Sequence, residues 1–259
     1  MMADLQGYVL GLAAIALLAV ATWSLSLWRG DVSIVDSLWS MLFLAATCIY
    51  VQQSNPPSMR AWLVLALVSL WALRLAIYIT ARNWGEPEDR RYQAIRARNQ
   101  PNFAIKSLYL VFLLQGALAW IVSLPLFVAA SSTQPLSWLD YLGGVVVAFG
   151  LAFEAIGDWQ LARFKADPGN QGRVMDRGLW RYTRHPNYFG ESCVWWGFYL
   201  LALGAGGWWS IVAPILMTAM LLKVSGVALL EKDIAERRPR YEQYIRQTNA
   251  FIPGPRRSM

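Results

Sequence analysis

The feature that most limits the possible folds is a series of apolar stretches, each about 20 residues long. A helix of about this length crosses the hydrocarbon layer of a membrane. Hydrophobic residues make up 56% of the 259-residue chain, whereas about 45–50% is usual in soluble proteins. The sequence therefore predicts an all-α, polytopic integral membrane protein. We expect seven transmembrane helices, at residues 7–27, 33–51, 61–81, 107–130, 138–158, 187–204 and 207–230.

No linker or low-complexity segment divides the chain, so we expect a single transmembrane domain over residues 1–259. The first apolar stretch lacks a small-residue cleavage site and is too long for the apolar part of a signal peptide, so we expect it to remain as a helix. Cys48 and Cys193 both lie inside predicted spans. Two isolated cysteines indicate neither a disulfide framework nor a metal site.

Basic residues are distributed unevenly about the predicted spans. Of the 23 Lys and Arg, Arg60 alone lies on one side, Arg74 and Lys223 lie inside spans, and the rest share the other side. Positive charge marks the cytoplasmic face of a membrane protein. The N-terminus is therefore expected outside and the C-terminus in the cytoplasm. This orientation accounts for the net charge of +7, so no nucleic-acid partner is needed to explain it.

Several ionisable side chains lie within the predicted spans, all in the cytoplasmic half. A charge at the centre of a membrane helix costs about 2.5–3.5 kcal/mol, so such residues usually line a polar cavity. A long side chain such as Lys223 can reach the interface instead, but the short carboxylates cannot do so. We therefore expect a polar cavity open to the cytoplasm. Its candidates are Asp36, Arg74, Glu154, Glu191 and Lys223, with Asp158 at a helix end.

Helical spacing places these candidates on polar stripes that can face one cavity. Asp36 and Arg74 are expected to form a buried pair, either as a structural salt bridge or as part of a catalytic site. The stripes are Ser33, Asp36, Ser37 and Ser40 on the second span; Trp71, Arg74, Tyr78 and Arg82 on the third; Glu154 and Asp158 on the fifth; and Asn187, Glu191 and Trp195 on the sixth.

The charged loop at 82–106 contains a candidate short helix. Residues Glu86 to Asp89 can cap it, and Tyr92, Ile95 and Arg96 lie along it. This helix either lies at the membrane interface with its arginines directed to water, or carries part of a functional site.

The stretch RYTRHPNYFGE, residues 181–191, holds the only histidine of the chain, His185. Pro186 suits a first helical position, so the free N–H groups of the following residues form an anion site. Arg181 and Arg184 can add bidentate contacts to phosphate or carboxylate oxygens. The stretch therefore predicts a clamp for a large anionic cofactor, although anchoring to lipid head groups would also use its arginines. Upstream cations are Lys165, Arg173 and Arg177, and hydroxyl or amide partners are Asp158, Asn187 and Glu191.

Two segments carry a resemblance to a known superfamily. GLWRYTRHPNYFGE, preceded by GDWQLARFKADPGNQGRV, resembles the C-terminal half of the steroid 5-alpha-reductase superfamily. RNWGEPEDRRY at 82–92 and DVSIVDSLW at 31–39 are typical of its bacterial branch, a domain of unknown function. The resemblance covers most of the chain and is most specific over 154–191. It implies a bacterial cytoplasmic membrane, with the active site open to the cytoplasm.

The resemblance also implies NADPH, which would transfer hydride to an activated C=C bond of an enone, steroid-like or other lipid. The chain lacks GxGxxG, so a Rossmann site is not expected; residues 138–259 would hold the cofactor between helices, and 1–130 would enclose a substrate entering from the bilayer. Where the steroid reductases have a Gln-Glu pair and a Tyr, this chain offers Asp36 and Tyr78 as catalytic residues, with Tyr92 as the next phenol. The cofactor residues would be Glu154, Asp158, Lys165, Arg173, Tyr182, Arg184, His185, Asn187 and Glu191.

A second resemblance leaves another activity open. Isoprenylcysteine and phospholipid methyltransferases have a similar R-H-P-x-Y-x-G stretch and a later Glu, here Glu231, and they bind S-adenosylmethionine. Three features favour the reductase: the basic, Gly-rich segment at 163–181, the Glu154 and Asp158 pair, and the predicted seven spans. Several phosphates need more cations than the single carboxylate of S-adenosylmethionine. A lipid-binding protein without enzymatic activity is a third interpretation.

Overall fold

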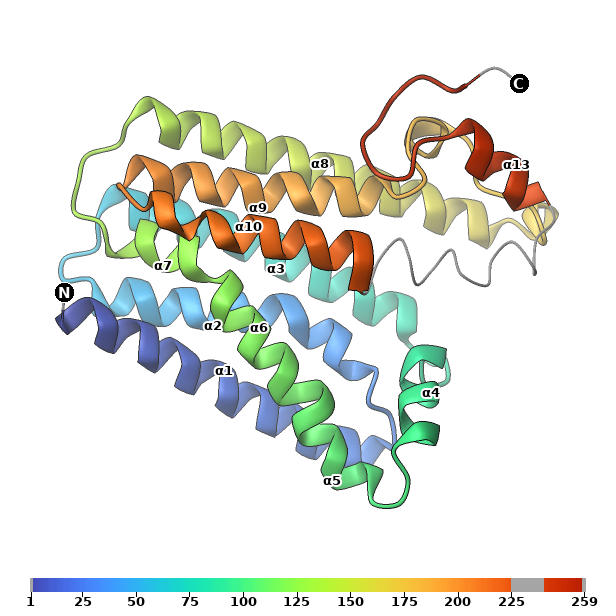
Figure 1. Ribbon diagram of the computed structural model, residues 1–259, viewed down its shortest axis with the longest axis horizontal. Coiled ribbons are helices and arrows are strands. Elements are labelled where there is room, and N and C mark those ends of the chain that lie inside the picture. Colours follow the sequence, from blue (N-terminus) through green and yellow to red (C-terminus); the bar gives the residue numbers. More distant parts are fainter. Residues whose placement is uncertain (1, 225–239, 258–259) are drawn as a thin grey trace. The chain divides into compact units, whose positions relative to one another are not determined.

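A computed structural model describes residues 2–224 and 240–257, and every named element among them is a helix (Figure 1). The chain divides into two compact units. The first comprises Met1–Trp138 with Leu201–Ser210, and the second comprises Leu139–Leu200 with Ile211–Met259. An isolated β-bridge between Thr183 and Asn249 lies within the second unit.

Five helices in the described part of the chain are long and apolar enough to cross a membrane. This agrees with the predicted polytopic membrane protein. Two further apolar segments lie where the sixth and seventh spans are predicted: α9 (Pro186–Gly204) and the shorter stretch Trp208–Lys223, which contains α10 (Val212–Ala219). The number of spans and their orientation therefore remain predictions. The five are Leu5–Arg29, Ile34–Gln53, Met59–Asn83, Phe103–Val122 and Trp138–Ala166.

The first unit is built around α1 (Met2–Arg29), α2 (Ile34–Gln53) and α3 (Met59–Asn83), with α2 packed against both others (Figure 1). Apolar side chains such as Val35, Leu42, Val64 and Val68 are buried within it. Where these side chains would otherwise contact water, their burial stabilises the unit by roughly 25 cal/mol for each Å² of apolar surface. Where they would otherwise contact lipid, close packing between the helices stabilises the unit instead.

The fourth predicted span, 107–130, corresponds to a candidate membrane helix that begins slightly earlier, at Phe103, and is interrupted at Ser123. The helical stretch begins at α5 (Phe103–Ser107), continues through a π-helical segment (Leu108–Leu113) into α6 (Leu114–Val122), and breaks at Ser123 before α7 (Leu124–Ser131). Pro125 explains the break, because it has no N–H to donate to the preceding turn and is suited to the start of a new helix. The buried Ser123 hydroxyl bonds to the Tyr50 hydroxyl at 2.8 Å, which joins the break to α2.

The second unit contains α8 (Trp138–Ala166) from Leu139 onwards, α9 up to Leu200, α10 and α13 (Arg240–Gln247). Gly143, Gly150 and Gly157 repeat every seven residues along α8, and Gly190 and Gly197 repeat in the same way along α9. A Cβ atom on Gly190 would lie 2.6 Å from the Gly150 carbonyl oxygen, and one on Gly197 would lie 2.8 Å from the Gly143 carbonyl oxygen. The two helices therefore pack backbone to backbone and run antiparallel (Figure 1). Small residues allow this close approach in membrane helices.

Candidate functional site

In the first unit, the predicted catalytic residue Asp36 is at the centre of a polar cluster formed by three helical segments. Its Oδ2 atom forms an ion pair with Arg91 Nη2 at 2.7 Å, and its Oδ1 atom accepts a hydrogen bond from the Tyr92 hydroxyl at 2.6 Å. Gln115 Nε2 donates to the same hydroxyl at 3.2 Å. The expected Asp36–Arg74 pair is thus wrong, because an arginine of the 82–106 loop occupies this carboxylate.

The short helix α4 (Arg90–Arg98) brings Arg91 and Tyr92 to Asp36. Asp89 caps it, as the sequence predicts, by accepting from the Arg91 N–H at 2.9 Å. Glu88 anchors the preceding loop: it pairs with Arg96 at 2.7 Å and accepts from the Val32 N–H, before α2, at 2.9 Å. These contacts fix α4 to the start of α2. Its arginines Arg91 and Arg96 therefore bind carboxylates of the protein, whereas a purely interfacial helix would direct them to water.

The environment of the cluster affects two groups that lie outside the spans. Burial raises the pKa of Tyr92, and the charge of Asp36 and the hydrogen bond to it raise it further, so the phenol keeps its proton. Burial alone would raise the pKa of Glu88, but hydrogen bonds from Arg96 and Val32 and the Arg96 charge lower it below its ordinary value. The cluster and the loop beside it therefore combine a protonated phenol, Tyr92, with an ionised Glu88 carboxylate.

Tyr78, the other predicted catalytic residue, lies on α3 in different surroundings. The Arg74 guanidinium lies 5.4 Å from the centroid of its ring, and that of Arg82 lies 5.9 Å from it. These distances are typical of cation–π contacts. The structure thus confirms the shared face of these three residues, but the phenol in contact with Asp36 is Tyr92. Gln115 was missed by the sequence analysis, although an amide in the predicted span 107–130 is a signal for it.

The other polar residues predicted on the same face of α2 as Asp36 make different contacts. Ser40 donates to the Ala72 carbonyl oxygen of α3 at 2.9 Å and so joins two helices. Ser33 and Ser37 instead line a separate cavity at the end of the helix.

In the second unit, ionisable residues are concentrated where α8 meets the start of α9. Glu154 and Asp158 of α8 are 2% and 3% exposed, and His185 and Glu191 are also buried. The close glycine contact places the Glu154 backbone against Gly190. Asn187, one turn before Glu191, is half-buried. The predicted concentration of polar groups inside this helical unit is therefore present.

The RYTRHP stretch also holds the C-terminal segment 240–257. The buried Arg184 donates through Nη1 to the carbonyl oxygens of Ile245, at 3.0 Å, and Thr248. Its own N–H donates to the Asn249 carbonyl oxygen at 2.9 Å. These bonds make Arg184 a support for the C-terminal segment, a role that the sequence analysis did not foresee. The exposed Tyr182 accepts through its carbonyl oxygen from the Gly254 N–H at 3.0 Å.

A basic cavity of about 510 Å³ lies between this C-terminal segment and the loop after α8. Three arginines contribute to it, and Arg256 forms an ion pair with Asp176 at 2.9 Å. Lys165 is exposed one residue after the lining residue Phe164, and Glu231 lies outside the described residues. The lining consists of Phe164, Arg173, Val174, Asp176, Arg177, Gln243, Tyr244, Gln247 and Arg256.

The helices and these polar clusters define a polytopic helical membrane protein with ionisable groups buried in both units. The chain belongs to the DUF1295 family of proteins of unknown function, whose family model matches residues 22–248. It is also similar to an uncharacterized protein of Schizosaccharomyces pombe, with 24% identity over 275 residues that cover 95% of this chain and 79% of that protein. No solved structure matches the chain.

Proposed function

We propose that the protein is a membrane-embedded, NADPH-dependent reductase of a hydrophobic carbonyl lipid. The resemblance of its motifs to the steroid 5-alpha-reductase superfamily suggests this class of reaction. In this proposal the chain has seven spans with its N-terminus outside, in a bacterial cytoplasmic membrane. The cofactor enters from the cytoplasm, and the substrate enters from the bilayer into the first four spans.

The observation that carries the proposal is the distribution of charge along α8. Glu154 and Asp158 are buried among helices, and Phe164 of the same helix lines the basic cavity. At 1.5 Å per residue, Asp158 and Glu154 precede Phe164 by about 9 and 15 Å along the axis. An extended ligand with hydroxyl groups at one end and phosphates at the other matches this order.

The residues of the second unit fit a dinucleotide in their donor chemistry. Arg173, Arg177 and Arg256 supply guanidinium groups, which bind phosphate oxygens in bidentate fashion. Carboxylates accept hydrogen bonds from ribose hydroxyls and carboxamides, and Asn187 can both donate and accept. When bound, NADPH would supply the hydride that reduces an activated C=C bond. A ligand with a single carboxylate, such as S-adenosylmethionine, would leave most of these cations unused.

In the first unit, the Tyr92 and Asp36 pair supports the role of a hydrogen-bond donor to the substrate. The phenol keeps its proton, and Arg91 holds the Asp36 carboxylate independently of it. Tyr92 can therefore turn its O–H from Asp36 to a substrate carbonyl oxygen without leaving a buried charge unpaired. A donor at this oxygen stabilises the negative charge that develops there during reduction. We propose Tyr92 for this role in place of Tyr78, with Asp36 as the residue that positions it.

Ligand-dependent thermal stability of the detergent-purified protein tests the choice of cofactor. A ligand at a hundred times its dissociation constant stabilises the folded state by about 2.7 kcal/mol. We expect NADPH to raise the midpoint, and Arg177→Gln to reduce this rise. Arg181→Gln is the matched control, because Arg181 is an exposed arginine of the same unit that does not line the basic cavity. A rise with S-adenosylmethionine and none with NADPH would instead identify a methyltransferase.

A pair of phenol variants tests the chemical role. Tyr92→Phe should leave the NADPH-induced shift intact and reduce NADPH oxidation by roughly 10²–10⁴-fold, the usual contribution of a positioned acid. The assay uses a 4-en-3-one steroid and an acyclic enone lipid as probes. Tyr78→Phe should retain turnover. The opposite pattern would assign the donor to Tyr78 and reject Tyr92.

A further inference from the structure

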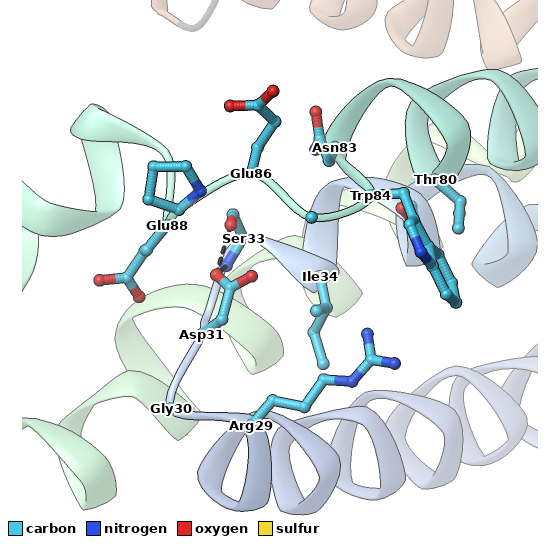
Figure 2. A pocket seen from close by; sticks show the side chains of 13 residues that line it. Arg29, Gly30, Asp31, Ser33, Ile34, Thr80, Asn83, Trp84, Glu86 and Glu88 are labelled. Carbon is cyan, nitrogen blue, oxygen red and sulfur yellow. Dashed lines mark hydrogen bonds between the residues drawn. The ribbon is translucent and has the colours of Figure 1, made fainter.

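A second cavity, unrelated to the cofactor residues, lies in the first unit at the ends of α1, α2 and α3 (Figure 2). It has a volume of about 430 Å³. Its walls include Arg29, the last residue of α1; Ile34, the first residue of α2; and Asn83, the last residue of α3. Because all three helices are long and apolar enough to span a membrane, the cavity lies at the level of the lipid head groups.

Aromatic residues support this depth. Trp84 lines the cavity and is 74% exposed, and Trp28 next to Arg29 is 82% exposed. Tryptophan is enriched where a membrane meets water. The cavity therefore opens beside the surface that lipids contact.

The walls are held by hydrogen bonds that do not depend on a ligand. Glu88 links the α3–α4 loop to the Val32 N–H, and Arg96 links Glu88 to the Gly30 carbonyl oxygen at 3.2 Å. On the facing turn, Asp31 Oδ1 accepts from the Ser33 N–H and hydroxyl. The cavity is thus preformed, which lowers the entropic cost of binding.

Two charged side chains that line the cavity have hydrogen-bonding groups that no described residue occupies. The Arg29 guanidinium makes no hydrogen bond or ion pair with any of them, and Asp31 Oδ2 accepts none from them. In Figure 2, the Arg29 side chain extends below Ile34 in the direction of Trp84, while the Asp31 carboxylate lies at Ser33. One cation and one carboxylate therefore border the same space from different parts of its wall.

We infer that this cavity binds the head group of a zwitterionic aminophospholipid, with its phosphate at Arg29 and its ammonium at Asp31. A guanidinium binds phosphate oxygens well, and a carboxylate with a spare oxygen accepts from an ammonium group. Glu86 adds a further negative charge, whereas the charge of Glu88 is balanced by Arg96. The lining thus opposes a purely anionic head group and favours one that carries a cation beyond its phosphate. The hydroxyl and amide groups of Ser37, Thr80 and Asn83 can bind the ester and glycerol oxygens.

The test measures binding of phosphatidylethanolamine and phosphatidylglycerol to the full chain in detergent, by native mass spectrometry and thermal shift. These lipids share the phosphate and differ in the amine. We expect phosphatidylethanolamine to bind at least tenfold more tightly. Equal binding, or preference for phosphatidylglycerol, would overturn the inference. Soluble phosphoethanolamine is the third ligand, and binding as tight as that of the lipid would show that the site takes a free metabolite.

Two variants separate the two charges. Arg29→Gln should weaken phosphatidylethanolamine binding at least tenfold, whereas Arg90→Gln, an exposed arginine outside the lining, should leave it unchanged. Asp31→Asn keeps an oxygen that can accept from Ser33 but loses the charge, so it should remove the preference for the amine. Unchanged selectivity in Asp31→Asn, or unchanged affinity in Arg29→Gln, would reject this site. Neither outcome depends on reductase activity.

Discussion

Replacing Gly190 with Ala tests the backbone contact between α8 and α9. The added Cβ would lie 2.6 Å from both the Glu154 nitrogen and the Gly150 carbonyl oxygen, whereas ordinary contact begins at 3.4 Å. Both neighbours are backbone atoms and cannot rotate away, so the helices must separate locally by about 0.8 Å. Inserting a methyl group into a tightly packed interior typically costs about 1–3 kcal/mol. The separation would also displace the buried Glu154 from the start of α9.

Thermal unfolding in detergent measures this cost. For chains of roughly this size, 1 kcal/mol corresponds to about 2–4 °C, so we expect Gly190→Ala to lower the midpoint by about 2–12 °C. Gly144→Ala is the control on α8, because its Cβ would have no atom within 4 Å. That variant should be neutral or slightly stabilising, since Ala favours a helix by up to about 1 kcal/mol over Gly. Equal midpoints for the two variants would refute the backbone packing.

Three other variants test polar contacts. The buried Arg60 donates to the Ser132 hydroxyl and to the Gln134, Pro135 and Gly204 carbonyl oxygens. Arg60→Leu should therefore destabilise the protein by at least about 3 kcal/mol in thermal unfolding, because it removes four hydrogen bonds from a charged group, each of which contributes about 1.5–3 kcal/mol. Glu88 has a lowered pKa in the folded state, so its stabilisation is present above its ordinary value of 4.5 and is lost as the pH falls through the folded value. Glu88→Gln should flatten the fall of the midpoint measured below about pH 4.5. Arg184→Gln should speed tryptic cleavage at Arg246, since it weakens the bonds to Ile245 and Thr248.

The pattern of apolar and polar residues predicts the helices well because it reflects whether each face of a helix contacts lipid, protein or water. The apolar windows correspond to the long helices, and the carboxylates of the fifth and sixth predicted spans, Glu154, Asp158 and Glu191, are buried. Periodicity gives the face of a residue on its own helix, but it does not identify the residue opposite. Spacing therefore pairs Asp36 with Arg74 of the neighbouring predicted span, whereas Arg91 reaches it from the short helix α4. The sequence predicts this short helix and its cap, but it does not identify the helix against which α4 packs.

Position along the sequence does not decide which cations line the basic cavity, for the same reason. Arg184 directs its donors to backbone carbonyl oxygens, and Arg163 lies over the Trp159 ring at 5.6 Å, so neither lines the basic cavity. Arg256 lines it instead, although it is 72 residues further along the chain than Arg184. A guanidinium contributes to binding only where its donors reach the ligand, because the Coulomb attraction of a distant exposed charge is screened within about 10 Å. Affinity for an anionic cofactor should therefore depend on Arg173, Arg177 and Arg256 and be nearly independent of Arg163 and Arg181.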